Sequence, residues 1–229
     1  MSRFKKHVFG IFAILLSISC TYDNTDDPSF PDISTKPISN ITFTTAESGG
    51  NVITDNGSTI TAKGICWSTN PNPTISDNVI SASTDNFVSN LNNLPQNGTY
   101  YVRAFATNAA GTGYGSEVSF NTWSLDNTKW AFLLNTSGSS GSSNTNYPGD
   151  VDFKDDGTTV WDEPSEPGVY TTHGTWTVQD DKVTYYFFGD PLAASYIFTG
   201  VVSGGVTSMS GTYTWGPNPD RTFTATKYP

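Results

Sequence analysis

Histidine, cysteine and basic residues are scarce in this chain of 229 residues. There are two histidines and two cysteines, and 11 basic residues stand against 21 acidic ones, for a net charge of −10. Only one histidine, His173, lies outside the first twenty residues, so a histidine-rich metal site or a hydrolase triad is not expected. The acidic balance excludes nucleic acid as a partner, because nucleic-acid binding depends on lysine and arginine contacts.

Long apolar runs are also missing, with one short exception at the N-terminus. The segment Val8–Ile18 is apolar and follows Arg3, Lys5 and Lys6. It is too short to span a bilayer, which requires about 20 apolar residues. A basic start, a short apolar core and small residues before a break are typical of a secretory signal. The sequence therefore predicts a signal peptide over residues 1–19.

The residues at this break, Leu16–Cys20, resemble the lipobox of bacterial lipoproteins. The resemblance implies diacylglycerol on the Cys20 sulfur and cleavage just before it; an ordinary secretory signal with an incidental cysteine is the alternative. The acidic stretch Thr21–Pro28 is similar to the surface-export signals of some Gram-negative lipoproteins, although a plain polar tether has the same composition. We expect a protein anchored in the bacterial outer membrane through Cys20 and exposed at the cell surface.

Cys66 has no cysteine to pair with once Cys20 carries the lipid. It lies in the apolar run Lys63–Trp67. A buried free cysteine usually behaves as a small hydrophobic residue, so we predict that Cys66 packs in a core and is not a reactive thiol.

The rest of the chain consists of short β-branched and aromatic runs that are broken by glycine, asparagine, aspartate and proline. Aromatic residues reach 14% of the chain, and long apolar patterns of helical period are absent. These features are typical of a β-sandwich or β-barrel, and the predicted fold class is all-β. Residues 20–36 are polar and contain Pro28 and Pro31, which favours an extended tether.

Residues 37–122 contain strand patterns every ten to fifteen residues and form the first predicted domain. Several segments resemble a fibronectin type III-like module, and the leucine- and proline-containing lead-in to a tyrosine looks like the tyrosine corner of such sandwiches. These segments are Leu94–Ala104, Asn108–Gly111 and Gly115–Thr122, together with Ala62–Thr74, which resembles a variant of bacterial surface proteins. The resemblance implies a β-sandwich with Trp67 in its core. Because a fold does not define an activity, we expect this domain to be a spacer.

Residues 123–229 contain eight short strand candidates separated by tight turns. They are Lys129–Leu134, Asp150–Lys154, Thr158–Asp162, Tyr170–Val178, Lys182–Phe188, Tyr196–Val202, Ser208–Trp215 and Arg221–Lys227. The last two alternate polar and apolar residues, which predicts one exposed and one buried face. Eight such strands close into a small antiparallel barrel, whose interior is filled by side chains or holds one small ligand.

This second domain resembles the lipocalin-like (calycin) barrels. The segments that carry the resemblance are Trp130–Phe132, Gly174–Val178, Met209–Tyr213 and Phe223–Thr226. They imply an eight-stranded lipocalin-like antiparallel β-barrel, with a second β-sandwich as the alternative. Arg221 opens the last strand, and antiparallel pairing with the first strand places it near Leu134.

An acidic segment, Asp150–Gly157, can be aligned with a calcium-binding loop. The alignment places Asp152, Asp156 and Glu163 at ligand positions, but Lys154 occupies a position that requires an oxygen ligand. A charged hairpin turn is therefore favoured, and no metal site is expected.

Paired carboxylates of the kind that hydrolyse glycosides are available at Asp162, Glu163 and Glu166. Their spacing does not distinguish catalysis from a solvated loop. We expect no enzymatic activity and no cofactor.

Aromatic side chains of the second domain are the candidates for ligand binding or for core packing. They are Trp130, Phe132, Phe153, Trp176, Tyr185, Phe187, Tyr213 and Trp215. If some of them line a cavity, they favour a small hydrophobic or ring-shaped ligand, whereas Trp161, Tyr186 or Tyr196 on the outside would stack on sugars.

The expected function is non-enzymatic: a lipid-anchored envelope protein that presents a small-ligand-binding barrel on a sandwich spacer. The alternative is an adhesion or glycan-binding accessory lipoprotein with a solid barrel.

Overall fold

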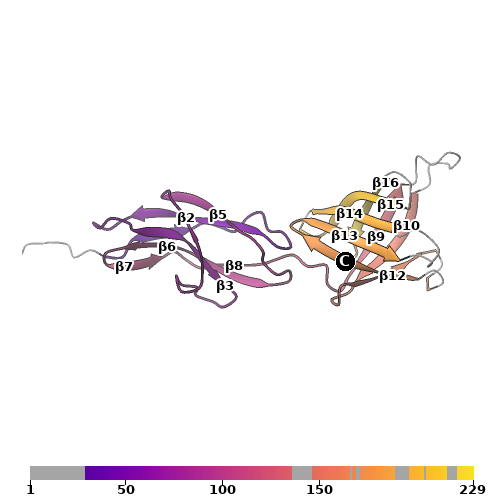
Figure 1. The fold of residues 1–229 in the computed structure, drawn as a ribbon, viewed down its shortest axis with the longest axis horizontal. Helices are drawn as coiled ribbons and strands as arrows, with labels where there is room; N and C mark the ends of the chain where they lie inside the picture. Colours follow the sequence, from indigo (N-terminus) through magenta and orange to yellow (C-terminus); the bar gives the residue numbers. More distant parts are fainter. Residues whose placement is uncertain are drawn as a thin grey trace, which may run out of the picture.

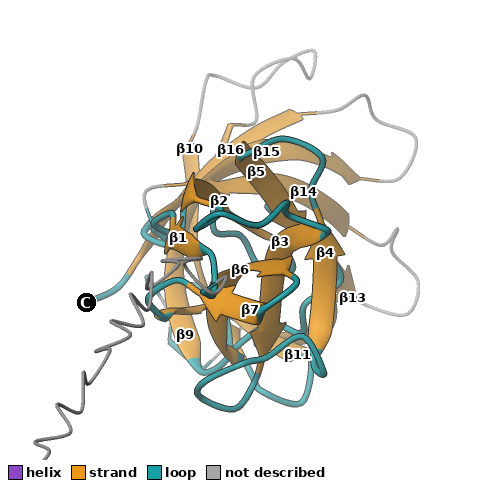
Figure 2. Ribbon diagram, turned by 90° about the vertical axis from the view of Figure 1, so that its left-hand side faces the viewer, coloured by secondary structure: helices purple, strands orange, loops and turns teal. Residues whose placement is uncertain are grey.

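The computed structural model describes residues 29–135, 146–165, 167–168, 171–188, 196–203, 205–215 and 221–229. Every regular element in these ranges is a β-strand (Figure 2). Over the same ranges, no helix is long and apolar enough to cross a membrane. The all-β class predicted from the sequence is confirmed. The predicted signal peptide, residues 1–19, and the predicted lipid site Cys20 lie outside the described residues.

The first part of the chain forms two antiparallel sheets that pack face to face. One sheet has the order β1-β2-β5, formed by β1 (Asp32–Thr35), β2 (Ala46–Thr54) and β5 (Asn86–Leu91). The other has the order β4-β3-β6-β7, formed by β3 (Ala62–Ser68), β4 (Asn78–Ser81), β6 (Thr99–Asn108) and β7 (Gly111–Tyr114), and β8 (Val118–Asn121) also pairs with β6. One buried cluster contains side chains from both sheets.

The longest strand of this core, β6, places alternate side chains on its buried face. Tyr100, Val102, Ala104 and Ala106 of β6 all lie on the buried face. The Tyr100 hydroxyl donates a hydrogen bond to the Pro95 carbonyl at 3.1 Å, which satisfies a buried polar group within five residues of chain.

Cys66 and Trp67 on β3 also contribute to this core, as predicted. Cys66 is fully buried, and burial raises the pKa of its thiol to about 11, which disfavours the nucleophilic thiolate. Trp67 is partly buried, and its ring meets the Tyr100 ring edge-on with centroids 5.8 Å apart.

The first sheet begins earlier in the chain than expected. Strand β1 lies inside residues 20–36, the segment predicted as an extended tether, and it pairs with β2. Ile33 is buried in the shared core, and Thr35 Oγ1 accepts a hydrogen bond from the Ala104 amide at 3.0 Å. Four residues contain too few alternating positions for a period of two to be recognised in the sequence.

The second part of the chain is a closed antiparallel barrel with the strand order β10-β11-β12-β13-β14-β15-β16-β9. Its strands are β9 (Thr128–Asn135), β10 (Asn146–Phe153), β11 (Thr158–Asp162), β12 (Thr172–Gln179), β13 (Lys182–Phe188), β14 (Tyr196–Ser203), β15 (Ser208–Trp215) and β16 (Arg221–Lys227). The predicted eight-stranded antiparallel barrel is confirmed, and four of its strands have the predicted bounds.

Strand β10 starts four residues before its predicted beginning at Asp150 and contains Pro148. Proline cannot donate to a sheet ladder and is usually confined to edge positions. Residues Asn146–Gly149 pair with β9 alone, because the pairing with β11 begins only at Asp150. Pro148 is therefore accommodated where one side of the strand has no ladder partner.

The two parts of the chain lie end to end in Figure 1, and a phenylalanine of the first part belongs to the core of the second. Phe43, between β1 and β2, is fully buried in the same cluster as Trp130, Val151 and Phe153 of the barrel. The β-branched and aromatic run Ile41–Phe43 has the composition of a strand. The segment is a loop, because Phe43 leaves its own sheet to pack against the barrel.

Hydrogen bonds hold the Phe43 loop against the turn between β12 and β13. The Phe43 amide donates to the Asp180 carbonyl at 3.1 Å. The Thr44 hydroxyl accepts from the Asp180 amide at 3.0 Å and donates to the Asp180 carboxylate at 3.2 Å. The Trp123 ring meets the Phe43 ring edge-on at 5.6 Å. This end of the barrel is therefore closed by a residue of the first part.

Replacing Phe43 by alanine is expected to lower the free energy of unfolding by about 3 kcal/mol, the usual cost of deleting a buried phenylalanine. Urea unfolding followed by tryptophan fluorescence measures the change. Phe30→Ala is the matched control, because the Phe30 side chain is 58% exposed. Equal stability of the two variants would show that Phe43 does not anchor the barrel.

Candidate functional site

The barrel interior is packed with aromatic rings, and most of the predicted candidates belong to this packing. Trp130, Phe132, Phe153, Trp176 and Tyr185 are all buried in one cluster. These five side chains fill much of the barrel interior. Two other candidates, Phe187 and Tyr213, line a cavity. The side chain of Trp215, the eighth candidate, lies outside the described part of the chain.

The cavity has a volume of about 310 Å³ and lies at the end of the barrel opposite Phe43. Its lining is mainly aromatic, with one acid and one base. The residues that line it are Leu134, Tyr147, Trp161, Glu163, Phe187, Tyr196, Phe198, Tyr213 and Arg221. Glu163 directly follows β11, and the others lie on β9, β10, β11, β13, β14, β15 and β16. Nearly the whole circumference of the barrel therefore contributes to the lining. We call this cavity the mouth pocket.

The period of two explains how polar side chains reach the mouth pocket. Phe223 and Ala225 of β16 are buried, and Arg221 is the next residue of the same face toward the mouth. Glu163 lies two residues after Trp161 of β11, and Tyr147 lies two residues before Gly149 of β10. Each is therefore the next residue of the inward face toward the mouth. Extending each alternation by one step beyond the apolar residues therefore accounts for all three positions, which apolar periodicity alone does not reveal.

Arg221 lies near Leu134, as predicted. Phe223 pairs with Leu134 across β16 and β9, and both Leu134 and Arg221 line the mouth pocket. Arg221 is the one cation among the described residues of this lining. An arginine is charged at all ordinary pH values and presents a planar fork of donors, so it can bind a carboxylate with two parallel hydrogen bonds.

Hydrogen bonds donated by two tyrosines organise the rim of the pocket. The Tyr147 hydroxyl donates to the Glu163 carboxylate, and the Tyr213 hydroxyl donates to the Asn135 carbonyl at 3.3 Å. Burial raises the pKa of the Tyr196 phenol; the neighbouring Tyr213 acts in the same direction and Arg221 in the opposite one. The Tyr196 phenol therefore stays neutral, as a hydrogen-bonding group, at ordinary pH.

The absence of a side chain at Gly149 makes room for the wall of the pocket. A Cβ atom at this position would lie 1.8 Å from Cζ2 of Trp161. The Trp161 ring therefore lies directly over the backbone of β10. It is only 5% exposed, so the expectation that Trp161 could stack on sugars from outside the barrel is wrong.

One tyrosine below the pocket has an unsatisfied hydroxyl. Tyr185 is 1% exposed, its hydroxyl meets no hydrogen-bond geometry with any described residue, and burial raises the pKa of the phenol. The buried Thr159 hydroxyl is the polar group close to it and opposes this rise in pKa, but the two hydroxyls do not form a well-aligned hydrogen bond. A buried polar group without a hydrogen bond is destabilising. The ring of Tyr185 therefore stabilises the barrel by packing, whereas its hydroxyl lowers the free energy of unfolding.

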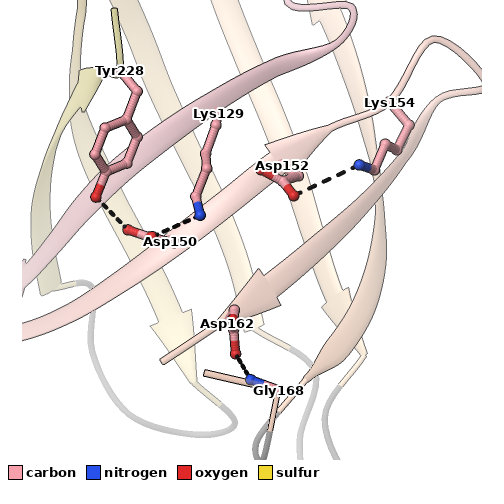
Figure 3. A network of polar contacts seen from close by, with 7 residues as sticks. All are labelled: Lys129, Asp150, Asp152, Lys154, Asp162, Gly168 and Tyr228. Carbon is pink, nitrogen blue, oxygen red and sulfur yellow. Dashed lines mark hydrogen bonds and ion pairs between the residues drawn. The ribbon is translucent and has the colours of Figure 1, made fainter. Parts of the chain in front are cut away.

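The acidic segment that was compared with a calcium loop forms structural contacts on the barrel surface (Figure 3). Asp152 pairs with Lys154 at 3.6 Å. Asp156 accepts hydrogen bonds from the amide and the hydroxyl of Thr158. Asp155 and Asp156 lie in the turn between β10 and β11, as expected for a charged hairpin. Among the described residues, no group of three or more histidine, cysteine, aspartate or glutamate side chains is arranged to hold a metal ion.

Neighbouring carboxylates have structural partners too. Asp150 accepts from Lys129 at 3.0 Å and from the Tyr228 hydroxyl at 2.9 Å, which ties β9 and β10 to the C-terminal residues (Figure 3). Asp162 accepts from the Gly168 amide at 2.9 Å. Glu163 is the carboxylate of this region that lines the mouth pocket, while Glu166 lies outside the described residues.

The remaining candidates lie on the outside of the barrel. His173 is an exposed residue of β12, opposite Val160 and Phe188 in the pairing. Tyr186 is 38% exposed and faces outward beside Ile197. Tyr196, the third residue considered for sugar stacking, instead lines the mouth pocket.

No protein-family model matches the chain, and a search of curated proteins finds no significantly similar relative. The geometry of the mouth pocket is therefore the basis on which a function can be inferred.

Tyr185→Phe is expected to leave the free energy of unfolding unchanged or to raise it by about 1 kcal/mol, because it removes a buried donor that makes no hydrogen bond. The matched control is Tyr100→Phe, which deletes the hydroxyl of another buried tyrosine; this hydroxyl has a partner, and its loss should cost about 1 kcal/mol. Urea denaturation of both variants makes the comparison. A larger loss for Tyr185→Phe than for Tyr100→Phe would contradict it.

Proposed function

We propose that this chain is a non-enzymatic, lipid-anchored protein of the bacterial cell envelope whose barrel binds a small ligand in the mouth pocket. The observation that carries the proposal is the pocket itself: an aromatic cavity of about 310 Å³ with an arginine and a glutamate at its opening. Small-molecule sites are typically apolar concavities of this size or larger with a few convergent polar groups.

The packing of the barrel supports a ligand site at one end only. Phe43, Trp130 and Phe153 are completely buried near the closed end. The lining of the pocket, by contrast, includes partly exposed side chains such as Tyr147, Phe187 and Tyr196. A barrel that served only as a solid support has no need of an inward-facing charged residue at its open end.

The proposed families agree with this architecture. A closed eight-stranded antiparallel barrel with Trp130 on its first strand fits a lipocalin-like module. Two packed sheets and the hydrogen bond from the Tyr100 hydroxyl to the Pro95 carbonyl fit a fibronectin type III-like sandwich. The lipobox-like residues before Cys20 support export, lipidation and outer-membrane anchoring at the cell surface.

Adhesion or glycan binding by the outer surface is the second candidate function. Tyr186 and Ile197 are neighbours across β13 and β14, and both are more than a third exposed. Two side chains make a small patch, however, so the mouth pocket remains the better supported site.

Ligand binding is tested by native mass spectrometry of residues 21–229 after exposure to an extract of bacterial envelopes. We expect an adduct that is lost on denaturation. Leu134→Trp should abolish the adduct, because Leu134 lines the pocket and a larger side chain fills it. Leu133→Trp is the matched control, since Leu133 is the adjacent residue and points outward with 42% exposure. A bare mass for the unmodified chain, or an adduct that survives Leu134→Trp, would reject the pocket as the site.

Lipid anchoring is tested by expressing the full chain in a Gram-negative host and partitioning the membranes with detergent. The unmodified chain should enter the detergent phase, and Cys20→Ala should move it to the aqueous phase, because the acyl chains provide the anchor. Cys66→Ala is the control and should partition like the unmodified chain. Retention of the Cys20→Ala variant in the detergent phase would disprove anchoring through this residue.

A further inference from the structure

The mouth pocket has features that narrow the chemistry of its ligand. The first is its aromatic floor, which is centred on Phe198. The rings of Trp161, Tyr196 and Tyr213 are all nearly parallel to Phe198, with interplanar angles of 27°, 19° and 18°. The ring centroids of Phe198 and Tyr213 are 5.1 Å apart. Aromatic rings at such separations attract one another by offset stacking, and a flat ligand ring can extend the same arrangement.

The second feature is the limited depth of the pocket. Phe198 and Trp161 are only 3% and 5% exposed, because rings pack below them as far as the closed end. A volume of about 310 Å³ holds a molecule of roughly 10 to 15 non-hydrogen atoms. A long acyl chain or a porphyrin exceeds this volume, so the pocket suits a compact ring system.

The third feature is the charge at the opening. Arg221 is the cation of the lining, and in the barrel order β16 is separated from β11 by β9 and β10. The acid of the lining, Glu163, follows β11 and already accepts a hydrogen bond from Tyr147. The opening is therefore polarised, with its positive side at β16.

These features favour one class of ligand. The guanidinium of Arg221 beside an aromatic floor offers an anionic ring compound two kinds of contact, whereas the one acid of the described lining, Glu163, already accepts a hydrogen bond from Tyr147. A carboxylate pairs with the guanidinium through short, charge-assisted hydrogen bonds, and surrounding aromatic side chains strengthen such a pair by excluding water.

We propose that the mouth pocket binds a small aromatic carboxylic acid, with the carboxylate on Arg221 and the ring against Phe198, Trp161 and Tyr213. This inference rests on the proposed function, since it specifies the ligand of the same pocket. Glu163 follows β11, which β9 and β10 separate from β16, and it can accept a hydrogen bond from a polar group on the other end of the ring.

The test compares acids with matched neutral or non-aromatic probes by titration calorimetry on residues 21–229. The probes are benzoate, phenylacetate and indole-3-acetate, the three corresponding amides, and cyclohexylacetate. At least one aromatic acid is expected to bind about tenfold or more tightly than its own amide, because a hydrogen bond to a charged group is lost in the amide. Phenylacetate is expected to bind more tightly than cyclohexylacetate.

Two variants assign the preference to Arg221. Arg221→Gln should remove the difference between acid and amide, whereas Lys227→Gln should retain it, because Lys227 lies at the other end of the same strand. Thermal melting of both variants confirms that they are folded. Equal binding of acids and amides by the unmodified chain overturns the inference without any variant, and so does an acid preference that persists in folded Arg221→Gln.

The result also separates this inference from the proposed function. If the envelope extract gives an adduct that Leu134→Trp abolishes, while none of the acids binds better than its amide, the pocket is a ligand site and the ligand class is wrong. If neither the extract nor any probe yields a complex, the ligand-binding function and the ligand class are both rejected.

Discussion

Closing eight short strands into a barrel forces every second side chain into a narrow interior, and the rest of this structure follows from how that volume is filled. Aromatic rings occupy most of it: Phe132, Tyr185, Phe198 and Phe223 contact one another in stacked or edge-on pairs. Rings are bulky enough to fill the space but too rigid to fill it evenly. The space that the rings leave unfilled lies at one end of the barrel, where the alternation places Tyr147, Glu163 and Arg221 on the inner face of the sheet.

The other end of the barrel depends on the first part of the chain. Phe43 occupies the core there, and Asp180 joins the two parts through three hydrogen bonds to Phe43 and Thr44. Asp180 has a left-handed backbone conformation, with φ at 56°, in a two-residue turn between β12 and β13. The first part is thus more than the spacer suggested by its sequence, because it completes the packing of the domain that it carries.

Much of the fold could be predicted because the strands alternate regularly. On β15 and β16, Met209, Tyr213, Phe223 and Ala225 are buried and the threonines between them face outward or are only partly covered, as the sequence indicates. The same reasoning placed Arg221 close to Leu134. It did not identify the pocket, since alternation says which side chains point inward and not whether their volumes fill the space. Trp161 shows the limit: its burial depends on the missing side chain of Gly149 on the neighbouring strand.

Composition and short local periods were sufficient to predict the all-β class, the closed eight-stranded barrel, the positions of most strands and the burial of Cys66. The destination of Phe43 and the location of the cavity depend on the folded chain as a whole. An apolar residue in a three-residue run has the same local pattern whether it joins its own sheet or another domain, and only long-range contacts distinguish the two. A cavity, likewise, is a difference between enclosed volume and side-chain volume, and the enclosed volume exists only after the barrel has closed.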